Sequence, residues 1–497
     1  MVALDRAYAE AALVEPAASA ATAAGRTSGV GARVAETVIV ANRLPAEYHP
    51  VTGWRHAPGG LVNALEPALA LTHALWVGWG GHPAPEDGQG PAHPPLASDG
   101  RIVEIPMSRP EMADHYDGFC NGALWPLYHG SVVPPVFRAH EFAAYQRIDR
   151  RFADRVAAIA PPGARIWVND YHLQLVPAML RAARPDLRIG FFLHVPFPEP
   201  DAFATLPWDG AILDGILGAD LVGFQTPESA QRFLATVGRR AGIAVRGDRI
   251  EIAGEDGPRT VAVGVHPVGP WAQRFADLAD TPRTVQAAEC IRADFGHPDL
   301  LLLGVDRLDY TQGIDRRIRA VAEVVTRAAR DGRDAQFIQV AMPSRTGLPA
   351  YRRLRDAVEE TLAGVNGELA ARGLRPIHYI HEALPVEQVV ALYVAADVMV
   401  VTPLADGMNL VSKEFVASRT RADGRHVLSS RAGAAVQLRD AWLVDPTDEA
   451  DIVRGLTAAL AAGPEEVAER MIALRRSVFD HDARAWARSF LDDLGGA

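Results

Sequence analysis

Three arginines each follow a short apolar run of the kind that forms a buried strand. They are Arg43, Arg307 and Arg345. A guanidinium group binds phosphate through parallel, charge-assisted hydrogen bonds, so arginines at strand ends are suited to phosphorylated ligands. The three positions therefore predict a site that binds phosphate groups and stabilises negative charge as it develops.

Backbone N–H groups offer further anion sites. Gly59-Gly60 precedes a helical pattern, and the run DGMN (406–409) precedes another helix that begins at Leu410. Free N–H groups at a helix start favour phosphate. Two plainer interpretations stay open, because Gly-Gly also forms ordinary turns and an Asp or Asn before a helix also serves as a simple N-cap.

Polar and aromatic side chains complete the candidate set. Asp170 and His194 lie at or just after the ends of two apolar runs, although a histidine there can equally be structural. Tyr116 and Trp125 fit a core, yet their O–H and N–H groups can also donate to phosphate. Glu414, about one helical turn beyond Asn409, can accept hydrogen bonds from hydroxyls. We expect a phosphorylated, polyhydroxyl ligand.

The sequence also argues against several classes of function. A net charge of −11 from 50 basic and 61 acidic residues argues against a general nucleic-acid binder. Neither a carboxylate cluster with metal spacing nor a nucleophile elbow is present, so we expect no metal and no cofactor. Two cysteines favour a reducing cytoplasm, and no apolar run reaches the ~20 residues of a membrane span.

The elements that must position these residues alternate between short apolar strands and longer helices, including 351–369 and 387–396. This alternation predicts α/β architecture with doubly wound parallel sheets, whose ligands bind beyond the carboxyl ends of the strands. The predicted strands are 37–41, 75–79, 165–168, 188–193, 221–224, 300–305, 336–340, 377–380, 398–401 and 426–429.

The Gly/Pro-rich passage VGVHPVGPW (263–271) divides these strands into two sets. At 497 residues the chain is too long for one core, so we expect two Rossmann-like domains facing across a cleft. Residues 1–36 are Ala-rich with interspersed acids, which predicts a weakly ordered extension rather than a signal peptide.

Taken with these features, the sequence resembles the trehalose-6-phosphate synthase family of GT-B glycosyltransferases, glycosyltransferase family 20, from about Thr37 onward. The resemblance implies an acceptor-binding domain over 37–265, a nucleotide-donor domain over 266–480, and a helix at 481–497 that crosses back to the first domain. The motifs that carry it are ANRLP, PGGL, YDGFCNGALWP, NDYHLQLVP, GFFLHVPFP, LVGFQT, GVDRLDYTQGID, the 343–345 turn, DGMNLVSKEF and RAGAA.

The resemblance also implies a role for each matching residue. His194, Asp170 and Arg307 match the residues at the reacting centre. The acceptor's phosphate would be held by Arg43, Tyr116, Trp125 and Arg345. The donor would be bound by Gly60, Arg307, Gln312, Asp406, Gly407, Met408, Asn409, Leu410, Val411 and Glu414.

Three positions depart from the family pattern. Gln312 stands where the family has lysine, Asn169 where it has histidine, and Arg431 where it has an aromatic residue. A lysine–phosphate hydrogen bond is worth about 1.5–3 kcal/mol, so its loss should weaken stabilisation of the leaving group. Arg431 is our candidate to compensate.

Within the family, the chain is most similar to the pseudo-glycosyltransferase class that makes validoxylamine A 7′-phosphate. This predicts a C–N bond formed with retention between GDP-valienol and validamine 7-phosphate, in antibiotic biosynthesis. The alternatives are trehalose-6-phosphate synthesis from a nucleotide-glucose and glucose 6-phosphate, and a non-catalytic sugar-phosphate sensor. A homodimer is the default expectation, and the sequence leaves the nucleotide base open.

Overall fold

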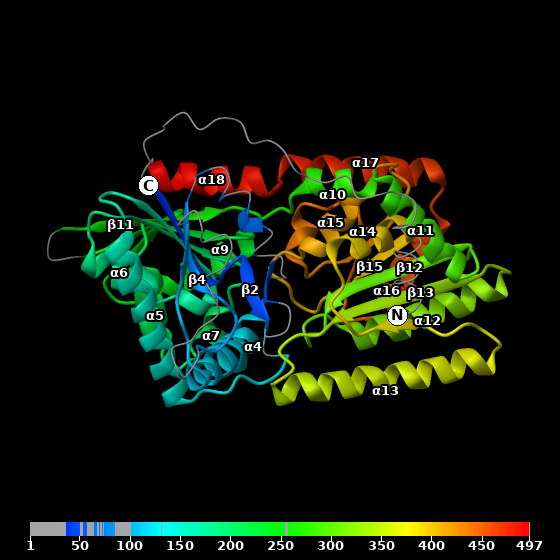
Figure 1. Ribbon diagram of the computed structural model, residues 1–497, viewed down its shortest axis with the longest axis horizontal. Helices are drawn as coiled ribbons and strands as arrows, with labels where there is room; N and C mark the ends of the chain where they lie inside the picture. Colours follow the sequence, from blue (N-terminus) through cyan, green and yellow to red (C-terminus); the bar gives the residue numbers. More distant parts are fainter. Residues whose placement is uncertain are drawn as a thin grey trace. The chain divides into compact units, whose positions relative to one another are not determined.

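The chain divides into two compact units in the computed structural model (Figure 1). The N-terminal unit comprises Val34–Trp271 and His481–Ala497, and the C-terminal unit comprises Ala272–Asp480. Of the predicted N-terminal extension, all but Glu36 lies outside the described residues. The structure describes residues 36–49, 53–56, 64–66, 69, 72, 74–84, 101–130, 132–253 and 257–496.

The N-terminal unit is built on a nine-stranded sheet in the order β5-β4-β1-β6-β7-β8-β11-β10-β9. The strands from β5 to β11 are parallel, and β10 and β9 run antiparallel to their neighbours. The strand order reverses between β1 and β6, which marks the switch point where such sheets bind ligands. The bounds are β1 (Thr37–Arg43), β4 (Leu75–Trp79), β5 (Ile102–Glu104), β6 (Arg165–Asn169), β7 (Arg188–Leu193), β8 (Leu221–Phe224), β9 (Ile243–Arg246), β10 (Arg249–Ile252) and β11 (Arg259–Val265).

The C-terminal unit has a six-stranded, wholly parallel sheet in the order β14-β13-β12-β15-β16-β17. Its switch point lies between β12 and β15. Apolar residues of β12, β13, β15 and the flanking helices form its buried core. The bounds are β12 (Leu300–Arg307), β13 (Ala335–Met342), β14 (His378–Ile380), β15 (Val398–Val401), β16 (Arg425–Ser429) and β17 (Trp442–Val444).

The predicted doubly wound α/β architecture is confirmed, and each predicted strand overlaps an observed one. The predicted strands did not include β5, β9, β10, β11 and β17, or the antiparallel pair of β2 (Ala46–His49) and β3 (Gly53–His56). The edge strand β9 alternates partly buried with exposed side chains, its neighbour β10 has one buried residue, Ile250, and both carry arginines. They therefore lack the continuous apolar run that identified the central strands.

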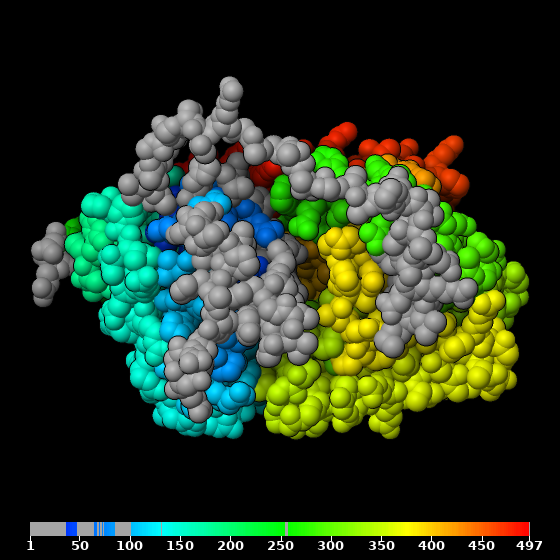
Figure 2. Space-filling model, in the orientation of Figure 1, coloured from blue at the N-terminus to red at the C-terminus, as the bar shows by residue number. Residues whose placement is uncertain are grey.

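Helices flank both sheets (Figure 1), and the long α13 is largely exposed on the face shown in Figure 2. In the N-terminal unit the helices are α3 (Arg109–Glu111), η2 (Met112–Leu124), α4 (Trp125–Tyr128), α5 (Ala139–Ile159), η3 (Tyr171–Leu173), α6 (Val176–Ala183), α7 (Pro200–Phe203), α8 (Asp209–Ile216), α9 (Pro227–Val237) and α18 (Ala483–Gly496). In the C-terminal unit they are α10 (Ala272–Ala279), α11 (Pro282–Asp294), α12 (Ile314–Arg330), α13 (Pro349–Ala371), α14 (Val386–Ala395), α15 (Leu410–Ser418), η4 (Gly433–Val436), α16 (Glu449–Ala461) and α17 (Pro464–Asp480).

The last helix, α18, packs its aromatic residues on the N-terminal sheet. The rings of Trp486 and Phe490 lie 4.9 and 4.7 Å from the ring of Trp167 on β6. Phe490 also lies over Gly190 and Gly223, where an added Cβ would come within 2.8 Å of its ring. Two glycines on neighbouring strands thus allow the C-terminus of the chain to pack beneath the strand ends that carry Asn169 and His194.

A buried arginine on α12 fixes the loop that follows β12. Arg317 is fully buried and forms an ion pair with Asp306, the penultimate residue of β12. Its guanidinium also donates to Gln339 Oε1 at 3.1 Å, to Thr402 Oγ1 at 3.0 Å and to the Gln312 carbonyl at 3.1 Å. One side chain therefore joins β12, β13, the segment after β15 and the loop that carries Gln312.

We expect Arg317→Met to lower the free energy of unfolding of the C-terminal unit by about 3–5 kcal/mol, because it leaves the Asp306 carboxylate buried without its cation. Arg319→Met, on the same helix, is the matched control. Arg319 is 41% exposed and pairs with Asp315 and Glu449 at the surface, so its loss should cost less than about 1 kcal/mol. Urea denaturation of both variants tests this, and equal effects would contradict it.

Candidate active site

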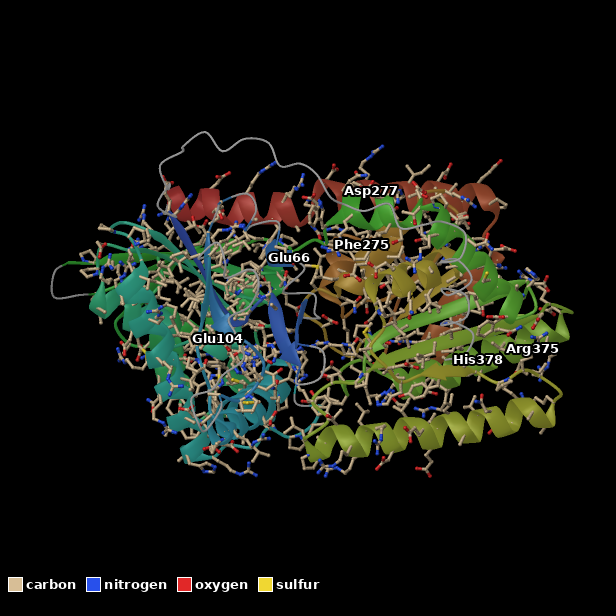
Figure 3. All side chains as sticks on the ribbon, viewed as in Figure 1. Glu66, Glu104, Phe275, Asp277, Arg375 and His378 are labelled. Carbon is tan, nitrogen blue, oxygen red and sulfur yellow. The ribbon has the colours of Figure 1, made fainter. Side chains whose placement is uncertain are left out.

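An aromatic platform holds Arg43 at the end of β1. The guanidinium carbon of Arg43 lies 4.9 Å from the ring centroid of Trp79, which ends β4. Gly81, with φ +82°, passes so close that an added Cβ would lie 2.3 Å from Arg43 Nη2. Two residues further along the chain than Gly80, His82 lies with its Nε2 3.6 Å from Oε1 of Glu104, a residue labelled in Figure 3. Trp79 and Gly81 therefore define where the cation lies.

Tyr116 lies in an unusual helix, and Trp125 begins the short helix α4 that follows it. Residues Met112–Leu124 form a π-helix, a rare conformation that is frequent at functional sites. It places the Tyr116 ring 5.6 Å from Trp79 and stacked at 5.8 Å on His172. Trp125 is buried, with its ring 4.0 Å from His129. The structure thus brings Tyr116 next to the platform that holds Arg43.

Asp170 is held in a strained backbone conformation directly after β6. Its φ of +76° and ψ of 168° belong to a region that is essentially restricted to glycine. The carboxylate accepts the backbone N–H of His194 at 3.2 Å through Oδ1, and Oδ2 lies 3.7 Å from His172 Nδ1. The structure therefore brings Asp170 and His194 together at the ends of adjacent strands, where strain is typical of a functional residue.

His194 lies in a mainly apolar corner at the end of β7. The residue is partly buried, and the rings of Phe192 and Trp486 lie 4.7 and 5.7 Å from its own ring. Burial lowers the pKa of His194 to about 3, so the imidazole is neutral at physiological pH. Its Nε2 lies 3.0 Å from Asn169 Oδ1. A neutral ring can offer a hydrogen bond but adds no cation to the site.

In the C-terminal unit, Gln312 and Asp406 meet across the switch point. Gln312 is buried, and its Nε2 donates to Asp406 Oδ2 at 3.3 Å. Asp406 also accepts from Met408 N at 3.2 Å and from Asn409 Nδ2 at 3.1 Å. The Asp406 carboxylate therefore accepts three hydrogen bonds around the 406–409 turn, and the neutral Gln312 donates one of them.

The turn at 406–409 ends in a helix cap, as the plainer interpretation of the sequence predicted. Asn409, with φ +74°, accepts from the backbone N–H of Ser412 at 3.0 Å. The segment after β16 packs against the same turn, since Gly433 N donates to the Asp406 carbonyl at 3.1 Å. An added Cβ at Gly433 would lie 2.0 Å from the Gly407 carbonyl oxygen. The cap does not exclude ligand binding at this turn.

Arg345 follows β13 and is paired with a buried carboxylate. Its Nη1 donates to Asp309 Oδ2 at 2.7 Å and to the Tyr351 hydroxyl at 2.7 Å, and Tyr351 donates to the same Asp309 oxygen. Burial raises the pKa of Asp309, but Arg345 and Arg307 outweigh this effect and hold it below its usual value. Arg307 itself is exposed. Arg345 and Arg307, both predicted site residues, are thus close enough to Asp309 to lower its pKa.

Two consecutive residues of α15, Lys413 and Glu414, have strongly shifted pKa values. Burial raises the pKa of Glu414 to about 7, and Tyr393 donates to its Oε2 at 3.3 Å. Burial also lowers the pKa of Lys413 to about 7, and its Nζ donates to Gln437 Oε1 at 2.5 Å. Glu414 is therefore suited to exchange hydrogen bonds with a hydroxyl, while Lys413 ties α15 to the end of η4.

Arg431 is half exposed and lies 3.5 Å from Asp445 Oδ1 in an ion pair. Its suggested role as a substitute cation for Gln312 stays a prediction. Gly60, the one predicted donor contact in the PGGL motif, lies outside the described residues. Leu410 and Val411 form the first turn of α15.

Sequence reasoning missed four residues that shape these sites: Trp79, Asp309, Tyr351 and Arg317. Trp79 ends a predicted strand, so the rule used for the other strand-end residues would have found it. Asp309 lies inside the GVDRLDYTQGID motif, but its pairing with Arg345 spans 36 residues and had no local signal. Within the part of the chain that the structure describes, no cluster of three metal-ligating side chains and no helix able to span a membrane is found.

The sequence profile of glycosyltransferase family 20 matches residues 29–495. The chain belongs to glycosyltransferase family 20. A trehalose-6-phosphate synthase of Mycolicibacterium vanbaalenii is 44% identical over 470 residues, which cover 93% of this chain and 96% of that protein.

Solved structures of family 20 enzymes agree with this assignment. The UDP-forming α,α-trehalose-phosphate synthase of Burkholderia vietnamiensis has a TM-score of 0.82 and 32% identity, and covers 94% of this chain and 100% of its own. The Burkholderia xenovorans enzyme in complex with glucose-6-phosphate has a TM-score of 0.82 and 30% identity, and covers 93% and 100%. These neighbours confirm the GT-B fold.

The family 20 relatives overturn one expectation. The prediction of a pseudo-glycosyltransferase that makes validoxylamine A 7′-phosphate is wrong, since relatives matching over almost the whole chain are trehalose-6-phosphate synthases. A GDP-linked cyclitol donor and an aminocyclitol acceptor gain no support from these relatives. The expectation gave too much weight to Gln312. This residue lacks the positive charge of the family's lysine, but it still donates a hydrogen bond to Asp406, so the turn at 406–409 keeps this contact.

The strain at Asp170 is open to a direct test. We expect Asp170→Gly to be more stable than Asp170→Ala by about 1–2 kcal/mol, because glycine adopts φ +76° without the Cβ penalty, even after its greater entropy in the unfolded chain. Both variants lose the same carboxylate, and both should lose turnover. Urea denaturation compares them, and an alanine variant as stable as the glycine variant would rule out strain at this position.

The charge deficit at position 312 gives a second test. We expect Gln312→Lys to tighten donor binding roughly tenfold, because a charge-assisted hydrogen bond to a diphosphate is worth about 1.5–3 kcal/mol. Arg431→Ala should weaken donor binding if Arg431 compensates. Titration calorimetry with the donor measures both, with the exposed Arg439→Ala as a control for charge alone. Unchanged binding in both variants would remove the compensation hypothesis.

Proposed function

We propose that the protein is a retaining trehalose-6-phosphate synthase that transfers a glucosyl group from a nucleotide-glucose to the anomeric hydroxyl of glucose 6-phosphate. The observation that carries this proposal is the 44% identity to a trehalose-6-phosphate synthase over 93% of the chain. The UDP-forming relatives favour UDP-glucose as the donor. The relative that holds glucose-6-phosphate favours that acceptor.

The residues at the N-terminal switch point support an acceptor with a phosphate group. Arg43 lies on the Trp79 platform beside Tyr116, which offers a cation and a phenol in one place. Trp125 is buried near Tyr171, at a ring distance of 5.8 Å. Arg345 belongs to the C-terminal unit, and a phosphate would have to share it with Asp309. We assign Arg43, Tyr116 and Trp125 to the acceptor's phosphate, and the matching role of Arg345 stays a prediction.

The C-terminal switch point supports a diphosphate donor. Arg307 is exposed after β12, and Gln312 and Asn409 lie around the Asp406 carboxylate. In the reaction the bond between the glucosyl carbon and the diphosphate oxygen loosens, and positive charge grows on the ring. Arg307 and the N–H groups at the start of α15 stabilise the departing diphosphate. Glu414 and Asp406 accept hydrogen bonds from sugar hydroxyls.

The acceptor oxygen then forms its new bond on the same face, which gives retention, and its proton passes to the leaving phosphate oxygen. No protein base is required for this transfer. Asp170 orients the acceptor, and His194 forms a hydrogen bond with the donor sugar. Bringing the two substrates together in one orientation supplies much of the rate enhancement.

Incubation with glucose 6-phosphate and UDP-glucose, GDP-glucose or ADP-glucose should yield trehalose 6-phosphate and the matching nucleoside diphosphate. We expect UDP-glucose to be the best donor, and the α,α linkage, read by NMR, to show retention. Arg307→Ala should reduce kcat/KM at least a hundredfold by removing a cation from the leaving group. We also expect EDTA to leave turnover unchanged, since arginines and backbone dipoles supply the electrostatic stabilisation.

Two outcomes would overturn this proposal. Binding of both substrates without product would instead indicate a sugar-phosphate sensor. Product formation that stops with EDTA and returns with a divalent ion would contradict the metal-free mechanism. Arg319→Ala, on the exposed face of α12, is the control for nonspecific loss of charge.

A further inference from the structure

Asn169, the last residue of β6, is fully buried, and its hydrogen-bond partners determine the orientation of its amide. Its Nδ2 donates to the Trp167 carbonyl at 3.0 Å and lies 3.4 Å from the Val40 carbonyl. Both neighbours are acceptors, so the NH₂ end of the amide must face them. The carbonyl oxygen, Oδ1, therefore faces His194.

This orientation determines which nitrogen of His194 carries the proton. Asn169 Oδ1 accepts hydrogen bonds and cannot donate them. The 3.0 Å contact with His194 Nε2 therefore requires a proton on Nε2. Because the ring is neutral, Nδ1 then carries a lone pair. Among the described residues, no hydrogen bond to His194 Nδ1 is found.

Besides the Asn169 contact, His194 meets its described neighbours through aromatic packing and through its backbone. Phe192 and Trp486 pack on the ring, and Gln225 Nε2 contacts only the His194 carbonyl, at 3.4 Å. The Asp170 carboxylate accepts the backbone N–H of His194 through Oδ1, and its Oδ2 lies 3.7 Å from His172 Nδ1. Nδ1 is thus a hydrogen-bond acceptor on a ring that packs against Phe192 and Trp486.

We propose that Asn169 is a positioning residue that holds His194 in the Nε2–H tautomer, so that Nδ1 accepts a hydrogen bond from a sugar hydroxyl. An acceptor at this point favours O–H donors and repels phosphate or carboxylate oxygens. It selects a hydroxyl-bearing part of the substrate and keeps charged groups away. Only the identity of the sugar rests on the proposed function; the tautomer follows from the buried amide.

The first test is direct observation of the tautomer. In protein labelled with ¹⁵N-histidine, with His194 assigned by comparison with His194→Gln, we expect one protonated and one unprotonated ring nitrogen from pH 5.5 to 9. The protonated nitrogen should be Nε2. A proton on Nδ1, or a doubly protonated ring at pH 7, would overturn the proposal without any variant having to fold.

Two substitutions of Asn169 separate positioning from simple packing. Asn169→Leu keeps the shape but removes the acceptor, so the ¹⁵N spectrum should show mixed tautomers and kcat should fall about tenfold, as for one lost hydrogen bond. Asn169→Asp places a carboxylate opposite Nε2–H, which raises the pKa of His194. Its activity should therefore rise with pH as His194 loses its second proton, a profile that the native protein lacks.

The matched control is Asn366→Leu. Asn366 exchanges hydrogen bonds with the backbone of Ile377 in the C-terminal unit and has no histidine partner among them. It should leave the His194 spectrum and the pH profile of turnover unchanged. If Asn169→Leu behaves like this control, Asn169 is structural only and the proposal fails.

The nature of the ligand group can be read from donor analogues. Replacing one donor hydroxyl at a time by fluorine, which accepts but does not donate, should identify a single position whose loss weakens binding in the native protein but not in His194→Gln. If no position does so, the hydroxyl assignment is wrong. If the tautomer is as expected but no trehalose 6-phosphate forms with any donor, the proposed function fails and the tautomer assignment remains.

Discussion

The ion pair between Arg317 and Asp306 is the interaction on which the C-terminal site depends. It lies wholly inside the unit, where a lone carboxylate would be very costly. Because Arg317 also donates to the Gln312 carbonyl and to Thr402, it fixes the loops after β12 and β15 against each other. The hydrogen bond between Gln312 and Asp406 across the switch point is possible only because this buried network has already set both loops.

In the N-terminal unit, backbone strain and aromatic packing hold the site residues in place. Asp170 is forced to positive φ where β6 ends, and its carboxylate is met by the backbone of His194 on the next strand. From below, α18 fills the space over two glycines and encloses His194. The result is a neutral histidine and a fixed carboxylate, while Arg43 on its tryptophan platform supplies the positive charge.

The C-terminal switch point has little positive charge that is not already close to a carboxylate. Arg345 and Arg307 both act on the buried Asp309, and Gln312 adds no charge beside Asp406. This explains why single departures from the family pattern misled the functional prediction. Replacing a lysine by glutamine alters the strength of anion binding but leaves the hydrogen-bonded turn, and hence the class of substrate, in place.

The sequence by itself determined the doubly wound architecture, because strands buried on both faces must be continuous apolar runs, and it determined which side chains follow those strands. It could not determine strands such as β9 and β10, whose partly exposed side chains interrupt the apolar run. Tertiary structure alone decided how the side chains are used: Asp309 reaches Arg345 over 36 residues, and Asn169 faces His194 over 25. Such contacts depend on which strands become neighbours, and strand order leaves no mark in a local stretch of sequence.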